Sequence, residues 1–253
     1  MKSRTIALIL ALSTALALHG QQKIVIAAAA NISAVAPRLE AAFHKGHGGM
    51  RLEFLFGASG TLVTQFLNGS PAQVFLSADT SFAQKLVDAG VATGPVRIYA
   101  RGSLILLSTK RLDFSKGLAV LADQAVAKIA IANPETAPYG KAAREALAAE
   151  GLLSRVESKF ITGQNITQTL QFTLTGADAG FVNKSALYTK ELIPFDREGE
   201  YWIAIDPSLY SPIDQGFVVM ETAASDPGVR AFADFLQSPE ARGIFIDAGY
   251  EVP

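Results

Sequence analysis

Short apolar runs alternate with segments of helical spacing along most of this chain, and this alternation constrains the fold more than any other feature. Strands buried in parallel sheets are continuous apolar runs, whereas helices repeat their apolar positions every three to four residues. Alternation of the two patterns predicts an α/β fold. The expected strands are 23–27, 52–56, 73–77, 96–108, 128–132, 159–162, 179–182, 201–205 and 215–219, and the expected helices are 37–44, 61–67, 81–89, 139–150, 166–174, 227–236 and 239–248.

These elements fall into two βα groups, one before about Leu104 and one between Lys128 and Val182. The last two expected helices have no strands of their own, so we expect them to pack on the first group. Each group is expected to form a lobe with a mixed, mostly parallel sheet flanked by helices, and a cleft lies between the lobes. The predicted lobes are 21–104 plus 212–253 (lobe I) and 105–211 (lobe II).

The first twenty residues have the pattern of a secretory signal peptide. Lys2 and Arg4 are positively charged, and an apolar run from Ile6 to Leu18 precedes small residues suited to cleavage. That run is well short of the roughly 20 residues that a membrane-spanning helix needs. We therefore predict a signal peptide over 1–20 and a soluble periplasmic protein without stable membrane insertion.

Composition excludes several other classes of protein. The chain has 253 residues, with 22 basic and 23 acidic side chains that nearly cancel, and no cysteine. A nucleic-acid-binding protein would need a basic face. Without cysteine there is no lipid attachment, disulfide, thiolate metal site or cysteine nucleophile.

Four turns between a strand and the next helix share one character, since each carries small, hydroxyl or amide residues and no lysine or arginine before the helix begins. In open α/β sheets, ligands bind beyond the carboxyl ends of the strands. Helix N-termini there leave backbone N–H groups unpaired and carry partial positive charge, so they bind anions without a cationic side chain. The turns are 28–33, 57–60, 136–140 and 163–167.

A shell of this kind contains donors only, which suits a fully deprotonated tetrahedral dianion. Monohydrogen phosphate carries a proton and would need an acceptor in the shell. Glu135 borders the third turn, but no carboxylate lies inside the four turns. The pattern therefore favours molybdate, tungstate or sulfate over phosphate.

Other interpretations of the same residues remain open. Asn31, Ser33, Ser59 and Thr136 are also typical helix N-cap residues, and such residues often do nothing else. An exported hydrolase is the competing enzyme class. However, the candidate nucleophiles Ser59 and Ser77 have no evident base, and His44 and His47 form a His-x-x-His pair with no third ligand nearby. No nucleotide-binding glycine motif occurs, so we expect a binding protein rather than an enzyme.

At these turns the sequence resembles the periplasmic molybdate-binding proteins of ABC transporters. The resemblance covers essentially the whole chain after residue 20, and its segments are specific when taken together in this order. They are VIAAAANIS (25–33), FGASGTL (56–62), NGSPAQVFLSAD (68–79), IANPETAPYG (131–140), QNITQTL (164–170) and GFV (180–182).

The resemblance implies a type II periplasmic-binding fold that closes on molybdate, or possibly tungstate, and delivers it to an ABC transporter permease. It also implies the oxyanion ligands, which match Ala30, Asn31, Ser59, Tyr139 and the backbone N–H of Ile166. No cofactor and no directly coordinated metal ion are expected, because the metal is held through its oxygens, and the protein is expected to be a monomer.

The sequence departs from the family pattern in two places. Many relatives have serine where Asn31 stands, and many have a tyrosine ligand where Asn183 stands, for which Tyr139 is the expected substitute. Sulfate, phosphate or another small solute remain alternative ligands. A regulator's sensing domain shares the fold but would lack a signal peptide.

Overall fold

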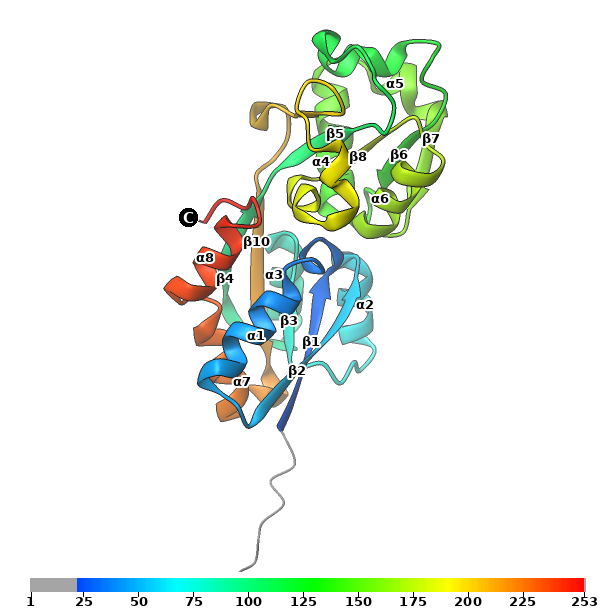
Figure 1. Cartoon of the computed structure of the whole chain (residues 1–253). Coiled ribbons are helices and arrows are strands. Elements are labelled where there is room, and N and C mark those ends of the chain that lie inside the picture. The colour runs from blue at the N-terminus through cyan, green and yellow to red at the C-terminus, as the bar shows by residue number, and fades with distance from the viewer. Residues whose placement is uncertain (1–21, 253) are drawn as a thin grey trace, which may run out of the picture.

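The computed structural model describes residues 22–252, so the predicted signal peptide lies outside the described residues. The described chain forms two lobes, one above the other in Figure 1, each built on a five-stranded sheet. The first sheet has the strand order β2-β1-β3-β10-β4 and the second has the order β7-β6-β8-β5-β9. The strands are β1 (Gln22–Ala29), β2 (Met50–Gly57), β3 (Val74–Leu76), β4 (Ala92–Gly102), β5 (Leu104–Leu107), β6 (Ile129–Ala132), β7 (Phe160–Gly163), β8 (Ala179–Asn183), β9 (Trp202–Ala204) and β10 (Ile213–Met220).

Both sheets are mixed. In the first, β1 pairs in parallel with β2 and β3, while β10 runs antiparallel to β3 and β4. In the second, β6 pairs in parallel with β7 and β8, while β5 runs antiparallel to β8 and β9. The two-lobed α/β architecture predicted from the sequence is thus the architecture of the protein.

The helices flank these sheets. Lobe I carries α1 (Ala36–Gly46), α2 (Ser59–Leu67), α3 (Thr80–Asp88), α7 (Pro227–Phe235) and α8 (Pro239–Ile246), and lobe II carries α4 (Pro138–Ala149), α5 (Leu153–Val156) and α6 (Ile166–Thr175). Short 3-10 helices are η1 (Ala30–Ile32), η2 (Phe114–Ala122), η3 (Glu157–Lys159), η4 (Lys184–Tyr188), η5 (Lys190–Phe195), η6 (Pro207–Leu209) and η7 (Glu221–Ala223). None of the helices in residues 22–252 combines the length and apolarity that a bilayer crossing requires.

The two C-terminal helices pack on the first lobe, as expected. Phe232 and Phe245 are fully buried and share one hydrophobic cluster with Ile24, Ile26 and other residues of the first sheet. Each such side chain contributes roughly 1.5–3 kcal/mol by leaving water. The hydrophobic effect therefore returns the end of the chain to the lobe in which it began.

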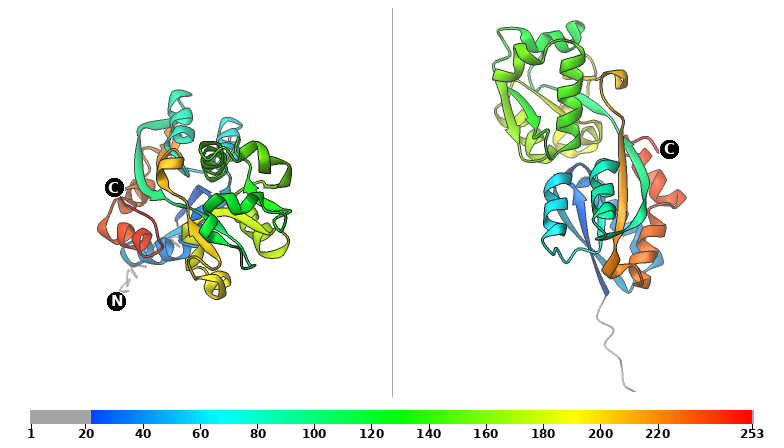
Figure 2. Two further views of the ribbon diagram at one scale, coloured as in Figure 1. Left: turned by 90° about the horizontal axis from the view of Figure 1, so that it is seen from above. Right: turned by 180° about the vertical axis from the view of Figure 1, so that it is seen from behind.

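The chain crosses between the lobes in two adjacent places. β4 and β10 pair antiparallel in lobe I; β4 leads up into lobe II and β10 returns from it, as the view from behind shows (Figure 2). The β segment expected over 96–108 is in fact two strands separated at Ser103, because the chain leaves one sheet and enters the other there. Leu104, the expected last residue of lobe I, is already in the second sheet.

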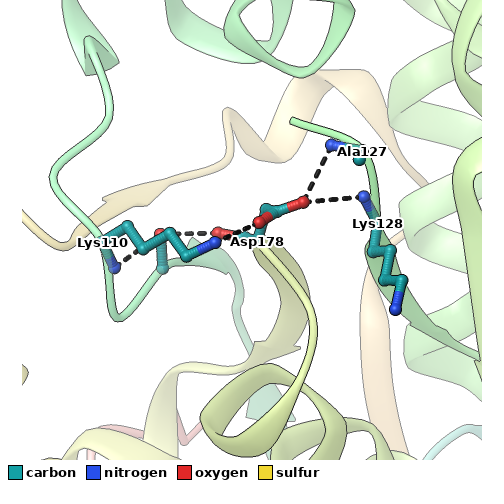
Figure 3. Close-up of polar contacts among 5 residues, drawn as sticks. Lys110, Ala127, Lys128 and Asp178 are labelled. Atoms are coloured by element: carbon teal, nitrogen blue, oxygen red, sulfur yellow. Dashed lines mark hydrogen bonds and ion pairs between the residues drawn. The ribbon is translucent and has the colours of Figure 1, made fainter. Parts of the chain in front are cut away.

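Asp178 ties together the end of lobe II that lies away from lobe I. Its carboxylate accepts backbone N–H groups of Ala127 (2.8 Å) and Lys128 (2.9 Å) and pairs with the Lys110 ammonium (Figure 3). Burial raises the pKa of this carboxyl, but these hydrogen bonds outweigh burial and hold the pKa below its usual value. One side chain thereby connects the chain after β5 with the start of β6.

Candidate oxyanion site between the lobes

A small cavity lies between the lobes at the carboxyl ends of five strands. Its lining comes from 29–31 after β1, 57–59 after β2, Ala78 after β3, 137–139 after β6 and 165–166 after β7. All the predicted ligands, Ala30, Asn31, Ser59, Tyr139 and Ile166, are in this lining. Residues more than a hundred positions apart in the sequence therefore meet at one place, although their role as ligands stays a prediction.

The size and polarity of the cavity restrict what it can hold. The cavity is small, with about 200 Å³ of empty space including its open mouth. None of the described residues that line the cavity carries a charge. The cavity therefore suits a compact ligand that binds through hydrogen bonds.

Three α-helices begin at the cavity wall. α2 starts at Ser59, α4 at Pro138 and α6 at Ile166. Backbone N–H groups in the first turn of a helix have no partner within the helix, and the helix dipole adds partial positive charge. The convergence of three such starts makes the cavity electropositive without a lysine or arginine, which is the condition for binding an anion.

Ser59 does not cap its helix. The N-cap of α2 is Ala58, and no side-chain cap bond forms there. Ser59 is fully buried, and its Oγ accepts the backbone N–H of Ala78 at 2.9 Å. Because that N–H occupies the oxygen, the hydroxyl proton remains available to a ligand.

Tyr139 brings a second hydroxyl to the cavity from the opposite lobe. The residue is 2% exposed and lies in the first turn of α4. Its hydroxyl oxygen is 3.1 Å from Gln215 Nε2. Burial raises the pKa of Tyr139 well above its ordinary value, and the nearby buried phenols of Tyr250 and Tyr99 raise it further. The hydroxyl therefore keeps its proton at any physiological pH.

The side-chain amide of Asn31 donates to other residues of the protein, so it is not free to donate to a ligand. Its Nδ2 donates to Gln215 Oε1 and to the Tyr250 hydroxyl, both at 3.0 Å, and its side chain caps no helix. Oδ1 is buried and has no partner. Since the amide nitrogen is committed elsewhere, we expect Ala30 and Asn31 to offer their backbone N–H groups at the start of η1.

Ile166 has an apolar side chain and can contribute only its backbone. It is the first residue of α6, whose N-cap Asn165 accepts the N–H of Gln168 at 3.0 Å. The cap satisfies that deeper N–H group. The N–H of Ile166 has no partner within the helix, in keeping with the role that the resemblance implies.

Sequence reasoning missed Ala78, Gln215 and Tyr250. Ala78 follows β3 in a strand-to-helix turn of the same kind as the other four, so its position was a usable signal. Gln215 lies within β10 and Tyr250 follows α8, so neither is in a strand-to-helix turn, and only the fold brings them to Asn31. Asn183 is not in the cavity wall; its Nδ2 donates to Ser185 Oγ at 2.6 Å.

The lobes are closed on each other. The N–H of Gly60 in lobe I donates to the carbonyl of Thr136 in lobe II at 2.9 Å, and Thr167 Oγ1 donates to the carbonyl of Ala30 at 3.2 Å. A Cβ on Gly60 would lie 3.0 Å from the Thr136 Cα and closer still to the Phe82 ring. Glycine at this position therefore lets the two lobes meet.

No catalytic arrangement surrounds the candidate nucleophiles in the described part of the chain. His44 and His47, the histidines in residues 22–252, lie at the end of α1, where His47 stacks on Phe43. Residues 22–252 also hold no cluster of three His, Cys, Asp or Glu side chains that could bind a metal ion. The arrangement has the features of a binding site for a small anion.

Two α/β lobes closing on a small cavity define the class of two-lobed solute-binding proteins. Residues 24–251 match the family model described as bacterial extracellular solute-binding protein. The chain belongs to this family.

Curated relatives and solved structures narrow the comparison. The chain is 39% identical to the molybdate-binding protein ModA of Rhodobacter capsulatus, over 95% of this chain and 93% of that protein. It is 36% identical to ModA of Azotobacter vinelandii, over 89% and 88% of the two chains. The structure of the periplasmic molybdate-binding protein of Azotobacter vinelandii superposes with a TM-score of 0.83 at 30% identity, covering 91% of this chain and 99% of that one. The resemblance indicated by the sequence is confirmed.

The fold alone is shared more widely. The sulfate-binding protein SubI of Mycobacterium tuberculosis superposes with a TM-score of 0.73 at 16% identity, covering 91% of this chain and 87% of that one. At that identity the likeness is one of fold. The ligand must therefore be argued from the cavity and not from the architecture.

Proposed function

We propose that this protein captures molybdate, and tungstate of the same charge and shape, in the periplasm and delivers it as a monomer to the permease of an ABC importer. The observation that carries the proposal is the uncharged, donor-rich cavity, in which three helix N-termini meet two buried hydroxyl groups. The relatives that share most of the chain's length are molybdate-binding proteins, which supports the same ligand here.

The mechanism follows from hydrogen-bond chemistry. Lobe I would offer Ser59 Oγ and the N–H groups of Ala30 and Asn31, and lobe II would offer the Tyr139 hydroxyl and the N–H of Ile166. Hydrogen bonds to a charged group are stronger than neutral ones, at about 1.5–3 kcal/mol each. Because the donors come from both lobes, the ligand stabilises the closed form, which is the form a permease would recognise.

The donor set also argues for selection by protonation state. A dianion without protons accepts at every oxygen, whereas monohydrogen phosphate must place one proton. Among the lining residues, Asn31 has a buried Oδ1 without a partner that could accept such a proton, and no carboxylate lines the described cavity. Sulfate has the same charge and shape as molybdate, so its rejection would depend on cavity size.

The proposal needs neither a cofactor nor a metal ion coordinated by the protein, and it assigns no catalytic residue. The metal of molybdate would be held through its oxygens. Sulfate, a dianion that the same uncharged cavity lining would suit, is the second candidate ligand.

Calorimetric titration of the purified protein with molybdate, tungstate, sulfate and phosphate tests the proposal. Molybdate and tungstate are expected to bind, and a concentration of 100 times the dissociation constant should stabilise the fold by about 2.7 kcal/mol. Phosphate at equal concentration serves as the control. Sulfate binding as tight as molybdate binding would sink the molybdate assignment.

A further inference from the structure

Gln215 lies directly behind the cavity. It is on β10, opposite Ala100 of β4. Its side chain is fully buried. It contacts the polar side chains of Tyr99, Asn31 and Tyr139, and only the last two also line the cavity. Gln215 itself is not in the cavity wall.

The hydrogen bonds around Gln215 give its amide one orientation in this structure. Its Oε1 accepts Asn31 Nδ2 at 3.0 Å and the Tyr99 hydroxyl at 2.8 Å, and the Tyr99 hydroxyl also lies 3.1 Å from the Ser77 carbonyl. An amide oxygen with two donors already on it has its acceptor capacity used. The amide nitrogen is thereby turned to the remaining neighbour, and Nε2 donates to the Tyr139 hydroxyl oxygen at 3.1 Å.

This orientation decides what Tyr139 presents to the cavity. A hydroxyl has one proton and two lone pairs. With Gln215 donating to the oxygen, the proton is left for a ligand. If Gln215 presented its own oxygen instead, Tyr139 would donate to it, and the phenol would turn a lone pair toward an incoming anion.

The backbone next to this contact is built to accommodate it. Gly102 is the last residue of β4. A Cβ at Gly102 would lie 2.8 Å from Gln215 Nε2 and would also collide with the Tyr139 hydroxyl. Glycine at position 102 is therefore needed for Gln215 Nε2 and the Tyr139 hydroxyl to come together.

We propose that Gln215 is a positioning residue for oxyanion binding, which commits the Tyr139 hydroxyl to donate into the cavity. This role rests on the proposed function, since it assumes that Tyr139 contacts the bound dianion. Gln215 itself touches no ligand and acts only through the phenol.

Gln215→Glu tests the role with a side chain of nearly the same shape. An ionised carboxylate still accepts from Tyr99 and Asn31 but cannot donate to Tyr139, whereas a protonated carboxyl can do both. Burial raises the pKa of a carboxyl, so the introduced carboxyl should change its protonation state between about pH 6 and 9. We expect molybdate affinity to fall about ten-fold or more at pH 9 and to recover toward pH 6, while the unaltered protein stays constant.

A double-mutant cycle separates positioning from general structural damage. In a Tyr139→Phe background the phenol proton is gone, so adding Gln215→Met, which removes the Nε2 donor without placing a charge near the dianion, should lower affinity less than about two-fold. Gln237→Glu is the matched control, because exposed Gln237 donates to the Ile98 carbonyl of the same strand β4 far from the cavity; it should bind normally. If Gln215→Glu fails to fold, the Gln215→Met cycle tests the role by itself.

The outcomes are distinct. Failure of the unaltered protein to bind molybdate would remove the proposed function itself. If the unaltered protein binds, then normal affinity of Gln215→Glu at pH 9, a loss that does not change with pH, or a loss from Gln215→Met that is as large in the Tyr139→Phe background as alone would each overturn the role of Gln215 alone.

Discussion

At the scale of single residues, the hydrogen bonds that a hydroxyl oxygen already accepts determine whether its proton is free for a ligand. Ser59 and Tyr139 come from different lobes, yet each hydroxyl oxygen accepts an N–H group, from Ala78 and Gln215 respectively. A hydroxyl that already accepts is left with a proton to donate. The protein thereby makes donors of two groups that in isolation can either donate or accept.

Ser59→Ala should weaken molybdate binding by about 1.5–3 kcal/mol, the range for a hydrogen bond to a charged group. Calorimetric titration measures the change. Ser108→Ala is the control, because Ser108 is also fully buried but donates to the Asp178 carbonyl away from the cavity. That variant should lose stability and keep its affinity. An unchanged affinity in Ser59→Ala would show that Ser59 is not a ligand.

At the scale of elements, the site is a set of helix starts held at fixed positions by two sheets. α2 follows β2 directly, whereas α4 and α6 follow the paired strands β6 and β7 of the second sheet. Parallel pairing places the carboxyl ends of those strands at one edge. The position of α4 and α6 relative to the cavity therefore depends on the integrity of lobe II.

Asp178 stabilises lobe II at the end away from the cavity, because its charged carboxylate accepts two backbone N–H groups and pairs with Lys110. Its folded pKa is lowered, so its contribution to stability is present above the unfolded carboxyl pKa of about 3.9 and is lost as the pH falls through the folded pKa. Asp178→Asn should cost about 1.5–3 kcal/mol of unfolding free energy at pH 7. The cost should shrink as the pH falls below about 4.

Urea unfolding at a series of pH values measures this effect. Asp88→Asn is the control, since exposed Asp88 accepts only the side chain of Gln84 within α3. This variant should leave the decrease in unfolding free energy at acid pH unchanged. A difference between Asp178→Asn and the unaltered protein that is the same at pH 3 and pH 7 would exclude the charge as the source.

At the scale of the whole molecule, function depends on the meeting of two lobes. The hydrogen bonds from Gly60 to Thr136 and from Thr167 to Ala30 exist only when the cleft is shut. Hinge closure of this kind is common among ligand-binding proteins. The adjacent crossings of the chain, next to the paired strands β4 and β10, are the natural place for such a hinge.

Gly60→Ala should hold the lobes apart, because in the closed form the added methyl group would lie 3.0 Å from the Thr136 Cα of lobe II. If the closed population falls to about a tenth, the apparent affinity for molybdate falls about ten-fold. Small-angle scattering without molybdate should then give a larger radius of gyration than the unaltered protein. Gly243→Ala, in α8 with no heavy atom within 4 Å of its added methyl group, should behave normally. Full closure of Gly60→Ala would contradict this account of the interface.

Much of this architecture could be predicted because its causes are local. Apolar runs and helical spacing place nearly every strand and α-helix within a few residues of its observed position, as for α4, expected at 139–150 and found at Pro138–Ala149. The 3-10 helix η2 was missed, because it is interrupted at Gly117, where φ is 56°, and so presents no regular period. The turns themselves could be recognised one at a time, and the five candidate ligands within them were assigned because these turns resemble those of the molybdate-binding proteins.

The sequence by itself determined the elements, the two lobes and the neutral character of the turns, since burial of apolar faces and helix-start chemistry act over a few residues. Only the tertiary structure decided that Asn31 commits its amide to Gln215 and Tyr250 and that Asn183 stays outside the cavity wall. It alone also decided that Gln215 stands behind Tyr139. Hydrogen bonds between side chains depend on distances of a few tenths of an ångström between elements far apart in the chain, and no pattern in the sequence encodes those distances.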